Sequence, residues 1–347
     1  MGEIMILENK LIQSLAFGTE YTETAGNKII FSRFSEQERN RLSYGKDNSW
    51  STAGVRIEFQ TDSKYISIAV STKKSNPHTR NFYSFDVLCN GIMLGQIKNF
   101  NNEPRYPYKK YNLEDRQKAF YLKTGIKHIC ICFPWSVQGI IRKIELDDKA
   151  VIKPIQKAEK VIMYGDSITQ GYDAAKSSLS YASRLADMLD ADVINKGIGG
   201  SVFMPELTKH KGNILPKFIT VAYGTNDWRG SDFEDFKNRC FKFYKNLAKN
   251  YPNVPIFALA PIWRADTNET HKLGSFSLIA DTLRKLATYH KNIHFINGIN
   301  FIPNNTVYYR DYYLHPNDAG FKIYADSLLK ELNKKFLHNN KNMEDLK

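Results

Sequence analysis

The first 150 residues show a period of two in their apolar positions. Short runs rich in Ile, Val, Phe and Tyr alternate apolar with polar residues: GVRIEFQTD (54–62), YISIAVST (65–72), FYSFDVLCNG (82–91), HICICFPW (128–135) and GIIRKIELDD (139–148). Such alternation is typical of half-buried β-strands. Asn90-Gly91 predicts a hairpin turn, because both residues tolerate a positive φ. Since no convincing amphipathic helix interrupts the series, residues 1–150 are predicted to form an antiparallel β-sandwich or jelly roll.

The pattern changes after Val151-Ile152-Lys153-Pro154, where apolar runs begin to alternate with helical segments. The predicted strands are 161–165, 192–195, 218–224, 255–261 and 294–297, and the predicted helices are 178–190, 232–249, 275–289 and 317–335. Ser231 and Asp232 are candidate caps for the second of these helices. Strands that are apolar on both faces and alternate with helices predict an α/β domain with a doubly wound parallel sheet, which we place at residues 158–338.

Length and composition agree with two domains that have real cores. The chain has 347 residues, of which 42% are hydrophobic, so wholesale disorder is excluded. The sequence has no run of eighteen apolar residues, and a membrane span is therefore not expected. Glu3 and Glu8 interrupt the N-terminal apolar positions, so a signal peptide is not expected and a cytoplasmic location is the default, unless the sequence has been trimmed.

The net charge of +13 raises the possibility of a nucleic-acid partner. The basic residues are spread along the chain and interleaved with Asp and Glu, which favours lysine-rich solvated surfaces, so no nucleic-acid partner is expected. The charge could still attract an anionic substrate. The four cysteines form no CxxC motif or Cys/His cluster, and we expect buried, inert thiols, with no metal site and no cofactor.

Polar and glycine-rich segments follow three of the predicted strands and precede the last helix. They are Gly165-Asp166-Ser167-Ile168-Thr169, Asn195-Lys196-Gly197-Ile198-Gly199-Gly200-Ser201, Gly224-Thr225-Asn226-Asp227 and Leu314-His315-Pro316-Asn317-Asp318-Ala319-Gly320. Each alone has a plain structural interpretation as a cap, a turn or a loop. Because functional sites of parallel sheets lie at the carboxyl ends of the strands, the segments also offer a serine, a base and oxyanion donors in one place.

These segments resemble the four sequence blocks of the SGNH (GDSL-type) hydrolase superfamily, in order, over roughly residues 158–335. The resemblance implies a flavodoxin-like fold and a serine hydrolase that acts on carboxylic esters. It makes Ser167 the nucleophile and His315 the general base. The oxyanion hole would consist of the backbone N–H groups of Ser167 and Gly200 and the side-chain amide of Asn226.

The chain departs from the superfamily pattern at the triad acid. The superfamily usually places an Asp three residues before the His, and Tyr312 occupies that position here. Either the loop carries one extra residue and Asp311 still reaches His315, or a backbone carbonyl orients the ring. Some enzymes of carbohydrate esterase family 2 have a Ser-His dyad, and they also carry a β-sandwich before the hydrolase domain.

The sequence says less about the substrate. No long apolar lid segment is evident, which argues against long-chain lipids. Trp228 with Arg229, and Trp263 with Arg264, follow two strand ends and are candidate substrate-binding residues that would stack on a sugar or hold an anion, although ordinary packing explains them equally well. We expect hydrolysis of a small acyl ester, acetyl foremost, on a carbohydrate or other small molecule. The alternatives are a glycan-binding protein with a degenerate hydrolase domain and a lipase or thioesterase. The oligomeric state is not predicted.

Overall fold

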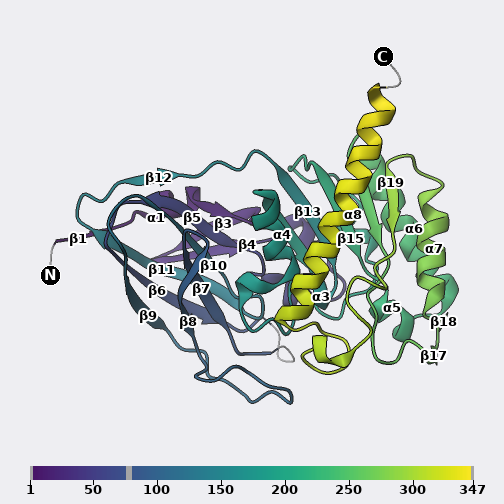
Figure 1. Cartoon of the computed structure of the whole chain (residues 1–347), viewed down its shortest axis with the longest axis horizontal. Helices are drawn as coiled ribbons and strands as arrows, with labels where there is room; N and C mark the ends of the chain where they lie inside the picture. The colour runs from purple at the N-terminus through teal and green to yellow at the C-terminus, as the bar shows by residue number, and fades with distance from the viewer. Residues whose placement is uncertain (1–2, 76–79, 345–347) are drawn as a thin grey trace.

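The computed structural model describes residues 3–75 and 80–344. Antiparallel sheets make up the N-terminal region, and a parallel sheet flanked by helices makes up the C-terminal region, which lies beside it along the long axis of the molecule (Figure 1). Within the described residues, every strand of the parallel sheet comes from the C-terminal region. The predicted fold class, an α/β domain after a β-rich one, is confirmed.

The antiparallel region consists of two sheets packed face to face. The first sheet has the order β3 (Tyr21–Ala25), β4 (Lys28–Ser32), β11 (Gln138–Asp147), β6 (Tyr65–Lys73), β9 (Arg116–Tyr121), with β1 (Ile4–Ile6) also paired to β11. The second has the order β12 (Ile152–Pro154), β5 (Arg56–Thr61), β10 (Lys127–Cys132), β7 (Ser84–Cys89), β8 (Ile92–Lys98), with β2 (Ala16–Phe17) also paired to β5. The alternating apolar residues of both sheets meet in one core that includes Phe31, Phe59, Ile68 and Ile131.

The local predictions for this region are partly right. Asn90 and Gly91 form the β7–β8 turn with φ angles of 50° and 76°. The series is nevertheless interrupted by short helices, α1 (Asn9–Ser14), α2 (Glu36–Arg41) and η1 (Asn48–Trp50). Helices of one or two turns are too short for an apolar period to show, but α2 carries a capping box between Ser35 and Glu38 that could have been found in the sequence. The sulfur atoms of Cys130 and Cys132 lie 3.5 Å apart, but they form no disulfide. Cys89 is only half-buried.

The C-terminal region contains a five-stranded parallel sheet. Its strand order is β14 (Asp192–Gly197), β13 (Lys160–Gly165), β15 (Phe218–Ala222), β16 (Ile256–Leu259), β19 (Ile293–Ile296). This order reverses direction at β13, as in flavodoxin-like sheets. Helices α4 (Tyr181–Leu189) and α8 (Asp318–Glu344) pack on one face, and α6 (Phe233–Asn250) and α7 (Ser277–Ala287) pack on the other. Asp232 caps α6 by accepting the Asp235 N–H.

Short elements complete the connections of the parallel sheet. They are α3 (Ser167–Gln170), α5 (Thr225–Gly230), η2 (Ser177–Leu179), η3 (Pro205–Thr208), η4 (Thr306–Tyr308) and the small hairpin β17 (Thr270–His271) with β18 (Gly274–Ser275). Two of them, α3 and α5, begin directly after the strands β13 and β15, and both carry a residue of the candidate site.

The two regions meet across a seam of buried polar groups. The Arg33 side chain is fully buried and donates to the backbone oxygens of Asn195 and Gly197 at 2.5 and 2.9 Å. Lys196 lies 2.6 Å from both Glu20 and Glu38. A division into residues 1–150 and 158–338 stays a prediction, and β12 carries the antiparallel sheet past residue 150.

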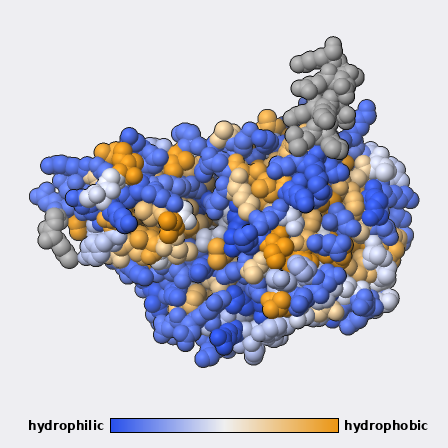
Figure 2. Space-filling model, viewed as in Figure 1, coloured by the Kyte–Doolittle hydropathy of each residue, from blue (hydrophilic) through white to orange (hydrophobic). Residues whose placement is uncertain are grey.

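The outer surface of the molecule is mixed in polarity. In the view of Figure 2, hydrophilic residues cover most of the face and apolar residues form separate small groups. Among the described residues, no helix is both long and apolar enough to cross a membrane.

Candidate active site

Ser167 follows β13, the second strand in the order of the parallel sheet. Strand β13 ends at Gly165, and Asp166 caps the one-turn helix α3 by accepting the Ile168 N–H at 2.9 Å. The Ser167 side chain begins this turn and is 4% exposed. Its Oγ lies 2.9 Å from Nε2 of His315, a residue almost 150 positions further along the chain. A serine hydroxyl at this distance from an imidazole nitrogen can lose its proton to it.

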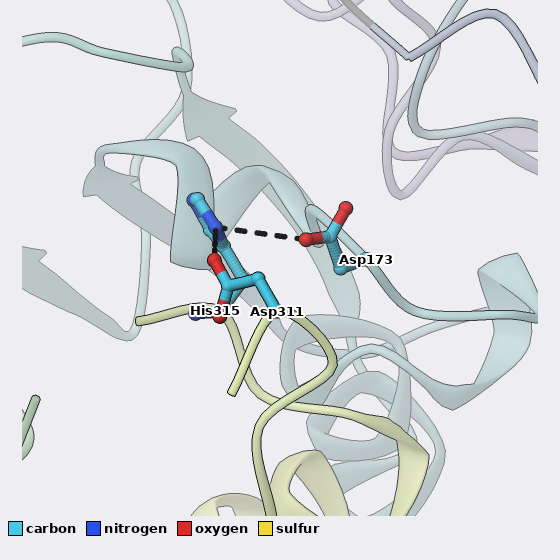
Figure 3. Close-up of side chains that lie close together, drawn as sticks. All are labelled: Asp173, Asp311 and His315. Carbon is cyan, nitrogen blue, oxygen red and sulfur yellow. Dashed lines mark hydrogen bonds and ion pairs between the residues drawn. The ribbon is translucent and has the colours of Figure 1, made fainter. Parts of the chain in front are cut away.

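The other ring nitrogen of His315 faces a carboxylate. Oδ2 of Asp311 lies 2.7 Å from Nδ1, as the close-up in Figure 3 shows. The structure therefore has the first of the two arrangements that the sequence left open, with Asp311 and not a backbone carbonyl at Nδ1. Ser167, His315 and Asp311 form a continuous hydrogen-bonded chain with the geometry of a Ser-His-Asp triad.

The loop before His315 explains how an acid four residues away reaches the ring. Tyr312, at the usual position of the acid, has a φ of 57° and a side chain that is 66% exposed. The extra residue thus projects into solvent and the chain folds back. Oδ1 of Asp311 then accepts the backbone N–H groups of Tyr313, Leu314 and His315 at 2.8 to 3.0 Å. One carboxylate both holds the loop and faces Nδ1.

The surroundings of Asp311 keep it ionised. Burial alone would raise its pKa, but the hydrogen bond and charge of His315, with the N–H groups of Leu314 and His315, lower the pKa to about 2. Asp311 is therefore a carboxylate throughout the neutral range. A carboxylate at Nδ1 holds that nitrogen in its protonated form, which leaves Nε2 free to accept the serine proton.

The candidate oxyanion donors lie on the neighbouring strand ends. Gly200 has a φ of 76°, in the left-handed region that favours glycine, and a Cβ there would lie 2.8 Å from the Tyr44 hydroxyl oxygen. Nδ2 of Asn226, in the first turn of α5, donates one hydrogen to the Ser201 carbonyl at 2.9 Å. Because an amide nitrogen carries two hydrogens, the second is available for a ligand.

Two of the predicted substrate-binding residues belong to the interior instead. Trp228 is fully buried, donates through its indole N–H to the Gly274 carbonyl at 2.8 Å and packs edge-on against Phe276. The Arg264 guanidinium, 1% exposed, pairs with Asp266. Contact of Trp228 and Arg264 with substrate stays a prediction, although both side chains have partners within the protein. Their spacing after a strand end did not reveal that the chain turns inward there.

Arg264 has a structural role beside the site. It donates to the backbone and side-chain oxygens of Thr225 at 3.0 Å and to the Tyr313 hydroxyl at 3.0 Å. Thr225 precedes Asn226 in α5, and Tyr313 lies between Asp311 and His315, so one buried guanidinium joins the helix and the loop that carry these candidate site residues. The other rim candidates are closer to solvent: Arg229 is exposed, and Trp263 is half-buried with its ring 5.4 Å from that of Tyr309.

Buried acids surround the serine. Burial raises the pKa of Asp166 to about 7, although the Ile168 N–H and the charge of His315 oppose the rise. Burial likewise raises the pKa of Asp227 to about 6, against the hydrogen bond and charge of Arg239. Both acids follow strands of the parallel sheet. Ionisation of these two buried carboxyl groups therefore lowers the free energy of unfolding.

The sequence interpretation missed Asp173 and Arg80. Asp173 lies six residues after Ser167 and is fully buried, with Oδ2 3.6 Å from His315 Nδ1. Arg80, from the loop between β6 and β7, pairs with it. Asp173, Asp311 and His315 lie close enough together to hold a metal ion, but the Arg80 guanidinium already supplies a positive charge to Asp173. No local pattern marks Arg80, since the pair forms only when the two regions pack.

Comparison with known proteins finds a family match over the part of the chain that carries the candidate site. Residues 163–323 match the GDSL-like lipase/acylhydrolase family, and this range contains Ser167, Asn226, Asp311 and His315. No curated protein matches the chain.

Solved structures share the whole architecture. A salicylyl-acyltransferase from a tetracycline biosynthetic pathway superposes with a TM-score of 0.78 at 19% identity, covering 92% of this chain and 94% of that one. A protein from Bacteroides ovatus described as a GDSL-like lipase gives 0.75 at 20% identity, covering 96% and 98%. A family two carbohydrate esterase from Clostridium thermocellum, in complex with cellohexaose, gives 0.64 at 16% identity, covering 82% and 94%. At these identities the likeness concerns the fold, including the β-rich region before the α/β region.

Proposed function

The C-terminal half of this chain is a GDSL-like lipase/acylhydrolase domain with an esterase-type activity, and we propose that it removes a small acyl group, acetyl foremost, from a carbohydrate or other small hydroxylated molecule. The observation that carries the proposal is the chain of contacts from Ser167 Oγ through His315 to Asp311, at 2.9 and 2.7 Å, at the carboxyl end of a parallel sheet.

The reaction proceeds through an acyl-enzyme on Ser167. Nε2 of His315 takes the hydroxyl proton as Oγ attacks the ester carbonyl, and Asp311 stabilises the imidazolium that forms. The N–H groups of Ser167 and Gly200 and the Asn226 amide bind the developing oxyanion. The imidazolium then gives its proton to the leaving alcohol. Water, activated by the same His315, attacks the acyl-enzyme and releases the carboxylic acid and free Ser167.

The lining of a neighbouring cavity supports a hydroxyl-rich leaving group. The cavity has a volume of about 840 Å³ and includes Arg310, the residue before Asp311. Apart from Pro107, the rest of its wall is amide, aromatic and charged: Asn101, Asn102, Glu103, Arg105, Tyr106, Lys109 and Tyr111. Amides, tyrosines and cations bind hydroxyl groups and sugar rings far better than they bind an acyl chain. The solved carbohydrate esterase with cellohexaose shares this architecture.

The test is hydrolysis of p-nitrophenyl acetate, butyrate and octanoate, and of acetylated mono- and oligosaccharides, by the native protein and by Ser167→Ala. We expect turnover that falls as the acyl chain lengthens, and at least about a ten-thousand-fold loss in Ser167→Ala. Octanoate turned over faster than acetate would favour a lipase, and acetyl transfer to an added alcohol without hydrolysis would favour an acyltransferase. Binding of oligosaccharides without turnover of any ester would make the protein a glycan-binding one.

A further inference from the structure

Asp173 is a buried aspartate whose backbone lies in the left-handed region, which residues other than glycine rarely adopt. Its φ is 70°, and the residue is fully buried. Aspartate tolerates the left-handed region better than most residues, but a buried non-glycine residue there still carries strain, which persists where the surrounding structure holds it. The turn aims Oδ2 at the same His315 nitrogen that faces Asp311, and Figure 3 shows the two carboxylates approaching that nitrogen from different directions.

Arg80 holds this carboxylate from the antiparallel region. Its Nε donates to Oδ1 of Asp173 at 3.0 Å and its Nη2 to Oδ2 at 3.2 Å, a two-pronged pairing. The guanidinium carbon also lies 5.2 Å from the ring centres of Tyr108 and Tyr172. The ring of Tyr172 in turn lies 5.6 Å from that of His315. The cation therefore binds the same carboxylate oxygen, Oδ2 of Asp173, that faces the imidazole.

Two carboxylates beside one imidazole pose an electrostatic problem. Each negative charge within about 4 to 6 Å favours the protonated ring. An imidazole that already holds its second proton cannot accept one from Ser167. A cation that offsets one of the two carboxylates removes this difficulty, and Arg80 lies where such a cation is needed.

We propose that Arg80 and Asp173 are positioning residues of the esterase site, a charge pair supplied across the seam that sets the pH at which His315 becomes a base. The proposal rests on the function proposed above. It gives the antiparallel region a part in the reaction, since the α/β region alone would present His315 with an uncompensated Asp173.

Other charged or titratable groups also face His315, and their effects must be distinguished from those of the Arg80–Asp173 pair. Those that face it are Asp311 and Arg310 on its own loop, Asp166 at the end of β13, Tyr172 and Asp173 after α3, and Arg80 and Tyr108 from the antiparallel region. Arg310 has partners of its own, because its Nε donates to the backbone carbonyl of Asp173 at 3.3 Å and its Nη2 pairs with Glu103 at 2.6 Å. Arg80 and Asp173 can thus be changed without removing any contact of Asp311.

The experiment is the pH dependence of kcat/KM for p-nitrophenyl acetate in the native protein, Arg80→Gln, Asp173→Asn and the double variant. In Arg80→Gln the cation is lost, and the acidic limb of the kcat/KM profile should move up by about one pH unit, because Asp173 then favours the imidazolium. In Asp173→Asn the anion is lost, and the limb should move down by about one pH unit, because Arg80 then opposes the imidazolium. The double variant should return close to the native limb. A residue that merely supported the fold would not give shifts of opposite sign.

Two further variants and a second readout complete the test. Arg80→Lys keeps the positive charge, and its acidic limb should lie at the same pH as that of the native protein. Arg142→Gln removes one positive charge from a surface pair with Asp115 and should leave the profile unchanged. The protonation midpoint of the His315 imidazole, followed by NMR with His315→Gln for assignment, should move as the limbs do, even in a protein without esterase activity. Failure of the proposed function would therefore appear as lost turnover alone. Unmoved midpoints, or shifts of the same sign in folded Arg80→Gln and Asp173→Asn, would overturn the charge pair.

Discussion

The two regions of the molecule use their polar residues in different ways. In the antiparallel region, apolar and polar residues alternate along the strands, so one face of each sheet builds the core and the other carries polar side chains. In the parallel region, strands such as β16 are buried along their whole length, and polar groups gather where the strands end. The candidate catalytic groups therefore come from the α/β region, while long basic side chains of the β-rich region reach across the seam and bind groups near them.

The difference shows that the antiparallel region is more than an appendage. Arg33 binds the backbone of β14, Arg80 binds Asp173, and the Tyr44 hydroxyl lies against Gly200. All three come from loops or edges that point at the strand ends of the other region. The following predictions test how sharply chemistry and support are divided between the regions, from the largest expected effect to the smallest.

Asp311→Asn should have the largest effect, on chemistry alone. The amide can favour the wrong imidazole tautomer and cannot stabilise the imidazolium, so kcat should fall by about ten-thousand-fold, or about 5.5 kcal/mol. Steady-state kinetics with p-nitrophenyl acetate measure it. Asp326→Asn, which removes an exposed acid paired with Lys322 on α8, is the matched control and should leave kcat unchanged. A loss of only a few-fold in Asp311→Asn would mean that Ser167 and His315 act as a dyad.

Much of the fold and the site could be predicted from the sequence, for physical reasons. Alternation in strands and their burial in a parallel sheet leave a direct mark on the apolar pattern, and Ser167 and His315 stand in recognisable blocks at strand ends. What could not be predicted depends on packing. Trp228 and Arg264 occur in the same kind of segment as Asn226, yet the chain buries them. Asp173 and Arg80 acquire their roles only from each other.

Arg33→Ala should break the seam rather than the chemistry. The fully buried guanidinium donates to the backbone oxygens of Ser51, Asn195 and Gly197, which would lose their partner. Burial lowers the pKa of Arg33 to about 9, so the group stays charged at neutral pH. The free energy of unfolding should fall by about 3 to 5 kcal/mol in denaturant titrations. Arg284→Ala, at an exposed pair on α7, is the control. An unchanged midpoint in Arg33→Ala would show that the regions are held by apolar contacts.

Asn226→Ala should slow the reaction without much effect on substrate binding. The amide stabilises a charge that exists only in the transition state, so kcat should fall by about a hundred-fold or more, roughly 3 kcal/mol, with KM nearly constant. Asn238→Ala on the outer side of α6 serves as the control. A rise in KM at constant kcat would instead assign the Asn226 amide to holding the substrate in its ground state.

Asp166→Asn should have the smallest effect, and its sign opposes the other stability change. Because burial raises the pKa of Asp166 to about 7 from 3.8, the native state holds this proton more tightly than the unfolded chain does. Below pH 4 both states are protonated and the group costs nothing. As pH rises from about 4 to 7 the unfolded state ionises first, so the free energy of unfolding falls, and above pH 7 the cost is complete. The neutral amide avoids this cost and keeps an oxygen to accept the Ile168 N–H.

The free energy of unfolding of Asp166→Asn should therefore match that of the native protein in urea titrations at pH 4.5 and exceed it by about 1 to 2 kcal/mol at pH 8. Asp281→Asn, an exposed acid, should give the same difference at both pH values. Equal differences for Asp166→Asn at the two pH values would show that the strand end beside Ser167 holds its carboxyl group without strain.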